Sequence, residues 1–294
     1  MMCEFLDPRN DYAFKRIFGN EKKPNVLRSF LNGTLNLSGE HTIDKVTILN
    51  PYQAPHIKDA KETILDVRCH DQSGHEYIVE MQVLPQTAFD QRVLYYASKS
   101  YALQLEGEED YDKLRKIIFL GVLGFNFGEG EYYISTHHIL DIETKQRLIR
   151  DFEFVFVQLP KFNKTENELH CMMDKWTYFL KHAHKLEQVP PVLQMEPEIA
   201  EAFEIANRCN WTKEELIAYE NRTSIRRDEM ARIRYGYEKG EKIGKEIGKE
   251  IGKEETTVEI AKKLIAQGLN LTVIAQATTL SIETLMELAK TINQ

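Results

Sequence analysis

Cysteine is scarce in this chain of 294 residues, and long apolar runs are missing from it. The four cysteines lie far apart and form no Cys-x-x-Cys pair, which argues against a disulfide framework or a zinc knuckle and is typical of a reducing cytosol. No run approaches the roughly 18 apolar residues that a membrane span needs. The first residues, MMCEFLDPRNDYAFKR, lack the apolar core of a signal peptide. The sequence therefore predicts a cytoplasmic protein without membrane segments.

Several function classes also lack support from motifs. The chain contains neither of the glycine-rich phosphate loops GxxxxGK[ST] and GxGxxG, and no G-x-S-x-G nucleophile elbow. His137 and His138 would face opposite sides of a strand, and without paired cysteines the histidines do not indicate zinc. The net charge of −8 disfavours a protein that coats nucleic acid with a broad basic surface. It leaves open an enzyme that meets DNA at one local site, where metal ions neutralise carboxylates.

Hydrophobic periodicity divides the chain into an α/β part and a helical part. Helical spacing occurs over residues 11–18, 25–31 and 86–105, and strand patterns occur over 43–49, 63–69, 76–84, 116–125, 132–140 and 152–159. This order predicts an α/β or α+β domain over residues 1–160. A helical extension is expected over residues 161–238, and a small helical tail over 256–294.

Between these two helical parts, the sequence of residues 239–255 repeats every four residues as GEKIGKEIGKEIGKE. On a helix, the isoleucines would form a winding ridge beside a row of glycines. Each interior glycine, however, costs about 0.8–1 kcal/mol relative to alanine. A flexible linker and a helix stabilised by self-association therefore both remain open. The C-terminal helices are the place where a homo-oligomer would form.

The segment LDVRCHDQSGHEYIVEMQ, residues 65–82, places acidic residues inside a hairpin pattern. Because strand side chains alternate, Glu80 and Gln82 face the same way. A turn centred on Ser73 would set Asp66 directly opposite Glu80, with β-carbons about 4.5–5.5 Å apart. Two carboxylates this close repel each other, and hard oxygen ligands at this spacing suit Mg²⁺. The segment therefore predicts a metal site.

Two alternatives to a metal exist for these carboxylates. They could lie on a solvated face of the sheet, or they could pair with one of three nearby cations, Arg68, Lys58 or Lys61. The apolar residues that flank Asp66 and Glu80 favour partial burial and hence the metal site.

Three segments in this order, NDYAFKRIFG, LDVRCHDQSGHEYIVEMQ and QRVLYYASKSYALQL, resemble the recombination-promoting nuclease (Rpn) family, which is also described as transposases. This family belongs to the PD-(D/E)xK nuclease superfamily, and the resemblance covers roughly residues 5–160. It implies a restriction-endonuclease-like α/β core with a mixed central sheet flanked by helices, here followed by a C-terminal helical extension. It also implies a DNA endonuclease that hydrolyses phosphodiester bonds with a metal ion.

The resemblance further implies roles for individual residues. Asp66 and Glu80 would hold Mg²⁺, or Mn²⁺ as a substitute, which polarises the phosphate and activates water. Gln82 stands where the superfamily usually has lysine, and it could orient a water by hydrogen bonding. Asp11 corresponds to an extra acidic residue that many members bring to this centre, although it could instead cap the first helix.

The helix after the hairpin carries candidates for binding DNA phosphates, namely Gln91, Arg92 and Tyr95. Arg92 and Tyr95, three residues apart, would share a face of this helix, and Arg92 could clamp a phosphate. The alternative is that Arg92 forms a salt bridge with Asp90 or another nearby carboxylate, while the aromatic side chain belongs to the core. Two other functions also remain open: a catalytically inactive nuclease fold that serves as a binding or assembly module, and a transposase that joins DNA strands.

Overall fold

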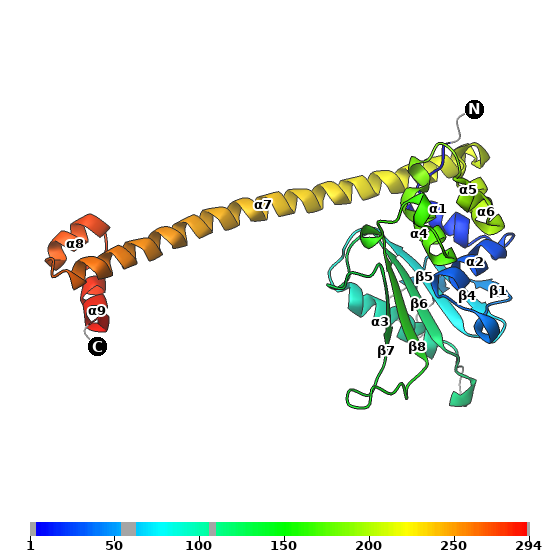
Figure 1. The fold of residues 1–294 in the computed structure, drawn as a ribbon, viewed down its shortest axis with the longest axis horizontal. Coiled ribbons are helices and arrows are strands. Elements are labelled where there is room, and N and C mark those ends of the chain that lie inside the picture. The colour runs from blue at the N-terminus through cyan, green and yellow to red at the C-terminus, as the bar shows by residue number, and fades with distance from the viewer. Residues whose placement is uncertain (1–3, 54–62, 106–109, 293–294) are drawn as a thin grey trace. The chain divides into compact units, whose positions relative to one another are not determined.

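The computed structural model describes residues 4–53, 63–105 and 110–292 (Figure 1). The chain divides into two compact units, Met1–Arg226 and Arg227–Gln294. The first unit contains the central sheet, and the second consists of helices. Each unit is described separately below.

A six-stranded mixed sheet forms the centre of the first unit, with strand order β1-β4-β5-β6-β8-β7. The strands are β1 (Val46–Leu49), β4 (Val67–Asp71), β5 (Glu76–Gln82), β6 (Ile117–Leu123), β7 (Ile134–His138) and β8 (Phe152–Gln158), while β2 (Tyr52–Gln53) and β3 (Thr63–Ile64) form a separate pair. Strands β5, β6 and β8 are parallel, and the remaining pairs of the sheet are antiparallel. Every residue of β6 is buried, as its continuous apolar run predicts for a strand covered on both faces.

Helices cover both faces of this sheet. The helices of the first unit are α1 (Asp11–Phe18), α2 (Pro24–Thr34), α3 (Phe89–Ala102), α4 (Met172–His182), α5 (Pro191–Gln194), α6 (Pro197–Ala206) and the start of α7 (Lys213–Ala266). Short 3₁₀ turns lie at Gly39–His41, Tyr111–Lys113, Leu159–Lys161, Glu166–Glu168, Ala183–Lys185 and Arg208–Asn210. Helices α1, α2, α4 and α6 share one apolar cluster with one face of the sheet, whereas α3 packs on the other face. The mixed sheet with flanking helices confirms the predicted α/β class (Figure 1).

The larger apolar cluster joins residues that are far apart in the sequence. Trp176 of α4 is fully buried, and its ring centre lies 5.7 Å from that of Phe18 and 5.6 Å from that of Phe30. Helix α4 therefore packs directly on α1 and α2, in the same core that supports the sheet.

Helix α1 begins at the residue after its cap. The side chain of Asn10 accepts hydrogen bonds from the main-chain N–H groups of Tyr12 and Ala13, which is the usual way to satisfy the first donors of a helix. The alternative in which Asp11 caps the helix is therefore wrong. Because Asp11 is the first helical residue, its carboxylate is free to contact other side chains.

The hairpin has the register that places Asp66 and Glu80 face to face. Val67 pairs with Val79, and the N–H of Asp71 donates to the carbonyl of His75 at 3.0 Å. The loop is thus three residues long, and Gly74 closes it with a φ of +80°, a conformation that favours glycine. This confirms the predicted turn centred on Ser73.

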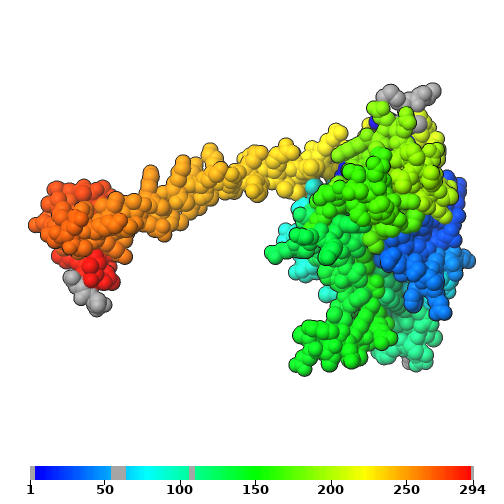
Figure 2. All heavy atoms as spheres, in the orientation of Figure 1, coloured from blue at the N-terminus to red at the C-terminus, as the bar shows by residue number. Residues whose placement is uncertain are grey.

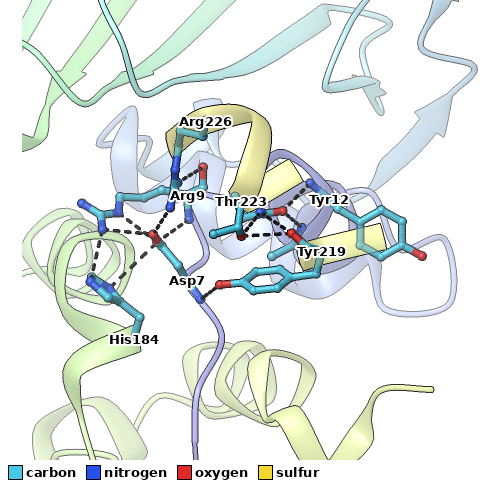
Figure 3. Close-up of polar contacts among 9 residues, drawn as sticks. Asp7, Arg9, Tyr12, His184, Tyr219, Thr223 and Arg226 are labelled. Atoms are coloured by element: carbon cyan, nitrogen blue, oxygen red, sulfur yellow. Dashed lines mark hydrogen bonds and ion pairs between the residues drawn. The ribbon is translucent and has the colours of Figure 1, made fainter. Parts of the chain in front are cut away.

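The start of α7 is fastened to the N-terminal segment of the first unit (Figure 3). The hydroxyl of Tyr219 accepts a hydrogen bond from the N–H of Asp7 at 3.0 Å, and the Asn10 amide donates to Thr223 Oγ1 at 3.0 Å. Arg226 donates to the buried Asp7 carboxylate at 3.0 Å. These bonds connect residues more than 200 positions apart, so they fix the first turns of α7 to the unit that carries the sheet.

Residues 239–255 are helical, since they lie inside α7. The end of α7 packs with α8 (Leu271–Thr278) and α9 (Ile282–Ile292) around Ala261, Ile274 and Leu285. Within the described ranges, no helix is both long enough and apolar enough to cross a membrane.

Candidate active site

Two acidic side chains are held together beside the C-terminal half of β5. The main-chain N–H of Asp66, just before β4, donates to Glu80 Oε1 at 2.9 Å. The N–H of Met81 in turn donates to Asp66 Oδ2 at 2.8 Å. The side chain of Asp66 is only 9% exposed. Main-chain donors therefore fix both carboxylates, while the register of the hairpin keeps them on the same face of the sheet.

The surroundings of these carboxylates disfavour their negative charge. Burial raises the pKa of Asp66 to about 6, against the opposing charge of Lys15 and together with the neighbouring Asp11 carboxyl. Burial also raises the pKa of Glu80 well above its usual range, and the charge of Asp66 adds to this effect. Both pKa values are raised chiefly because the two carboxyls are removed from water, and a bound cation would oppose this effect.

Lys15 of α1 partly compensates this charge. Its Nζ lies 3.1 Å from Asp66 Oδ1 and 3.1 Å from Asp11 Oδ1. Burial alone would lower the pKa of Lys15, but the charges of Asp66 and Asp11 outweigh burial and raise it. The other oxygen of Asp11 lies 3.6 Å from Arg222 Nε at the start of α7. The structure thus brings Asp11 to the site, where its carboxyl interacts both with Lys15 and directly with the side chain of Asp66.

Sequence reasoning missed Lys15. The one available signal was its position four residues after Asp11 on a predicted helix, a spacing that brings two side chains together. The contact with Asp66 bridges the first helix and the hairpin, and no local pattern indicates it.

Gln82 and Arg92 form the next contact along β5. The Gln82 amide nitrogen donates to the carbonyl of Leu84 at 2.7 Å, and its oxygen accepts from Arg92. Arg92 also donates to Gln86, and its charge lowers the pKa of Glu80 against the larger effect of burial. Both ends of the Gln82 amide are therefore engaged, and the amide holds the guanidinium of Arg92 near Glu80.

The two other candidates on α3 are exposed to solvent. Tyr95 is 42% exposed, and Gln91 is exposed with its amide against Asp90 of its own helix. Tyr96, rather than Tyr95, lies beside Arg92, with the guanidinium 5.9 Å from the ring centre. Burial raises the pKa of Tyr96, and the nearby charge of Glu80 raises it further. Arg92 and Tyr96, four residues apart on α3, therefore lie beside each other, and the assignment of Gln91, Arg92 and Tyr95 to DNA phosphates stays a prediction.

Arg68, one of the three cations considered as a partner of Asp66, pairs with another carboxylate. Arg68 Nε instead contacts Glu76 Oε1 at 2.6 Å, on the same hairpin but farther from the carboxylate pair. Lys58 and Lys61 lie outside the described residues.

The donor set fits a hard divalent cation with few protein ligands. In the ranges that the structure describes, no group of three or more His, Cys, Asp or Glu side chains converges as metal ligands would. Asp66 and Glu80 offer two carboxylates, and Mg²⁺ is usually bound by one or two carboxylates together with water and substrate phosphates. The adjacency of these two carboxylates, in which the N–H of Asp66 bonds to Glu80, agrees with such a ligand.

Comparison with known proteins gives one match. Residues 8–236 match the model of the family described as PD-(D/E)XK nuclease family transposase. No curated protein and no solved structure matches the chain. The matched range includes both carboxylates of the pair, Lys15 and Arg92, and it ends inside α7.

Proposed function

The chain belongs to the PD-(D/E)XK nuclease family transposases, and we propose that it is a Mg²⁺-dependent DNA endonuclease. Membership confirms the resemblance seen in the sequence and indicates a nuclease-type function, that is, hydrolysis of phosphodiester bonds. The observation that supports the proposal is the half-buried carboxylate pair, in which the N–H of Asp66 bonds to Glu80 at 2.9 Å.

On this proposal, Asp66 and Glu80 hold Mg²⁺, and Mn²⁺ can replace it. The bound ion would polarise the scissile phosphate and lower the pKa of a water. The remaining ligands come from water and from the DNA backbone. A location in the cytoplasm and a role in DNA recombination belong to the same proposal.

The charged residues around the pair have separate roles. Lys15 orients the Asp66 carboxylate and supplies, from α1, the positive charge that Gln82 lacks. Gln82 positions Arg92 through the bond between its amide oxygen and the guanidinium. Arg92 then binds a non-bridging phosphate oxygen of the DNA, because a guanidinium matches phosphate geometry. Asp11 acts on the site directly, through its side-chain contact with Asp66, and also through Lys15.

The test compares isosteric variants of the full chain. Asp66→Asn and Glu80→Gln should abolish the nicking of plasmid DNA in Mg²⁺ and should also abolish Mg²⁺ binding in calorimetry. Asp90→Asn removes an exposed carboxylate of α3 and serves as the matched control, which should cut and bind like the wild type. Equal cutting by the Asp66 and Glu80 variants would reject the assignment of the site.

The alternative, an inactive nuclease fold that serves as a binding module, has one observation in its favour. Lys15 already contacts Asp66, so the site is partly neutralised by the chain itself. A folded wild-type protein that binds neither Mg²⁺ nor Mn²⁺ in calorimetry would support this alternative. Strand-transfer products in addition to cut DNA would identify a joining activity.

A further inference from the structure

The middle of α7 carries isoleucines at every fourth position, and their side chains are about half exposed. Every residue from 231 to 256 is exposed, and Figure 2 shows this stretch in yellow and orange. Ile243, Ile247 and Ile251 are 46%, 52% and 50% exposed. An exposed row of large aliphatic side chains is unfavourable in water and indicates a contact surface.

A row of glycines lies beside the isoleucines. Gly240, Gly244, Gly248 and Gly252 repeat at the same four-residue interval, and among the described residues nothing lies within 4 Å of where their β-carbons would stand. Because successive residues are about 100° apart on a helix, the four positions of the repeat form four adjacent rows. The glycine row is a groove between the isoleucine ridge and the lysines.

Glycine inside a helix lowers the stability of that helix, so this groove destabilises α7 unless the helix pairs with another segment. Its benefit is that another backbone can approach closely along the row, as in small-xxx-small helix pairs. A ridge of isoleucines from a partner would fill the groove and cover both surfaces.

Charges on the two sides of this face determine which partner fits. Lys245, Lys249 and Lys253 border the glycine row, and Glu246, Glu250 and Glu254 border the isoleucine row. When two copies are related by a twofold axis parallel to the helices, the lysine side of one copy meets the glutamate side of the other. An antiparallel arrangement would instead place lysines against lysines and glutamates against glutamates. The charges therefore fit a second copy of the chain in parallel orientation.

We infer that residues 243–254, in which lysine and glutamate keep the same order in every repeat, form a parallel, symmetric contact between two copies of this chain. The isoleucine row of each copy lies over the glycine row of the other, and lysines pair with glutamates along both sides. Residues four apart follow rows inclined to the helix axis, so two such rows interlock at an interaxial angle of about −50° rather than in a left-handed coiled coil. The contact does not depend on the nuclease activity proposed above.

Sedimentation equilibrium of the full chain tests the contact. The wild type should dimerise reversibly, and the double substitution Gly244→Ala with Gly248→Ala should raise the dissociation constant tenfold or more. Alanine favours an isolated helix over glycine, so helix content measured by circular dichroism should not fall in this variant. The control is Gly236→Ala. Gly236 continues the same four-residue interval, but Tyr235 rather than an isoleucine precedes it and it lies outside residues 243–254, so this variant should leave the dissociation constant unchanged.

Salt then tests the orientation. Raising the NaCl concentration screens attraction between opposite charges, so the dissociation constant of a parallel dimer should rise. A wild type that is monomeric at all concentrations, or a double variant that dimerises like the wild type, would overturn the contact. A dissociation constant that falls with salt would overturn the parallel orientation.

Discussion

Replacing Lys15 with methionine should destabilise the first unit, and a divalent cation should restore part of the loss. Methionine keeps an apolar stem but removes the ammonium group that lies 3.1 Å from both Asp11 and Asp66. The Asp66 carboxylate, only 9% exposed, is then left without its cation. Removing one partner of a buried ion pair is destabilising because the other partner keeps its charge without compensation.

The size of the effect follows from the exposure of the two partners. Removing one partner of a buried pair costs about 3–5 kcal/mol, whereas exposed pairs contribute about 0.2–1 kcal/mol. Lys15 is 35% exposed and Asp66 is nearly buried, so we expect a loss of about 1–2 kcal/mol in the free energy of unfolding. In a unit of this size, each kcal/mol lowers the melting temperature by about 2–4 °C. The expected decrease is about 2–8 °C.

Calorimetric melts with and without Mg²⁺ measure both the loss and its recovery. In the wild type, Lys15 competes with a cation for Asp66, so Mg²⁺ should raise the melting temperature of the Lys15→Met variant more than that of the wild type. A free ligand at 100 times its dissociation constant adds about 2.7 kcal/mol. The matched control is Lys23→Met. Lys23 is 40% exposed and pairs with Glu201 at 2.9 Å, and this variant should lose less than about 1 kcal/mol and show no additional response to Mg²⁺.

Two results would refute this reasoning. The first is a Lys15→Met protein that melts at the temperature of the wild type, because the ammonium group would then contribute nothing to the first unit. The second is a response to Mg²⁺ that persists in the double variant Lys15→Met with Asp66→Asn, because the ion would then bind elsewhere.

Two other predictions concern the support of the site. Burial alone would raise the pKa of Asp7, but its hydrogen bond with Arg9 and the charges of Arg9, His184 and Arg226 lower it overall (Figure 3). The stabilising effect of the Asp7 carboxylate is therefore complete above the ordinary pKa of about 4 and is lost as the pH falls through the lower pKa of the folded state. The difference in free energy of unfolding between wild type and Asp7→Asn, measured with urea, should shrink in acid. A difference that stays constant with pH would contradict this. Gly124→Ala should lower the free energy of unfolding by about 1–3 kcal/mol, because the new β-carbon would stand 2.9 Å from the Cα of Val83 beside the end of β5. The control is Gly130→Ala. No described atom lies within 4 Å of the β-carbon position of Gly130, so this variant should melt like the wild type.

Local patterns in the sequence were sufficient for most elements of the first unit. The helix predicted over residues 11–18 is α1, and the hairpin register follows from a turn whose composition fixes its centre. Both depend on interactions between near neighbours, namely a cap and a three-residue loop closed by Gly74. The opposition of Asp66 and Glu80 could be predicted for the same reason.

Contacts between distant parts of the chain could not be predicted in this way. The bond between Lys15 and Asp66, the packing of Trp176 on Phe18 and the link from Asp7 to Arg226 each join separate elements. The face that α3 turns to the site depends on its packing against the sheet and not on its own sequence. For the repeat in α7, glycine propensity and helical periodicity oppose each other, so the sequence left two alternatives open.

The candidate active site and the proposed contact between two copies occupy separate parts of the chain. The family match ends at residue 236, before the glycine rows begin at Gly240, whereas the first turns of α7 lie within the match and in the compact unit that carries the carboxylates. Arg222, in those first turns, contacts Asp11 and so extends the chain of charges from Lys15 into α7. One helix therefore contributes to the charge balance of the site at its start and presents the isoleucine and glycine rows farther along. Because the two functions depend on different residues, loss of dimerisation in the glycine variants should leave metal binding intact, and loss of metal binding in the carboxylate variants should leave dimerisation intact.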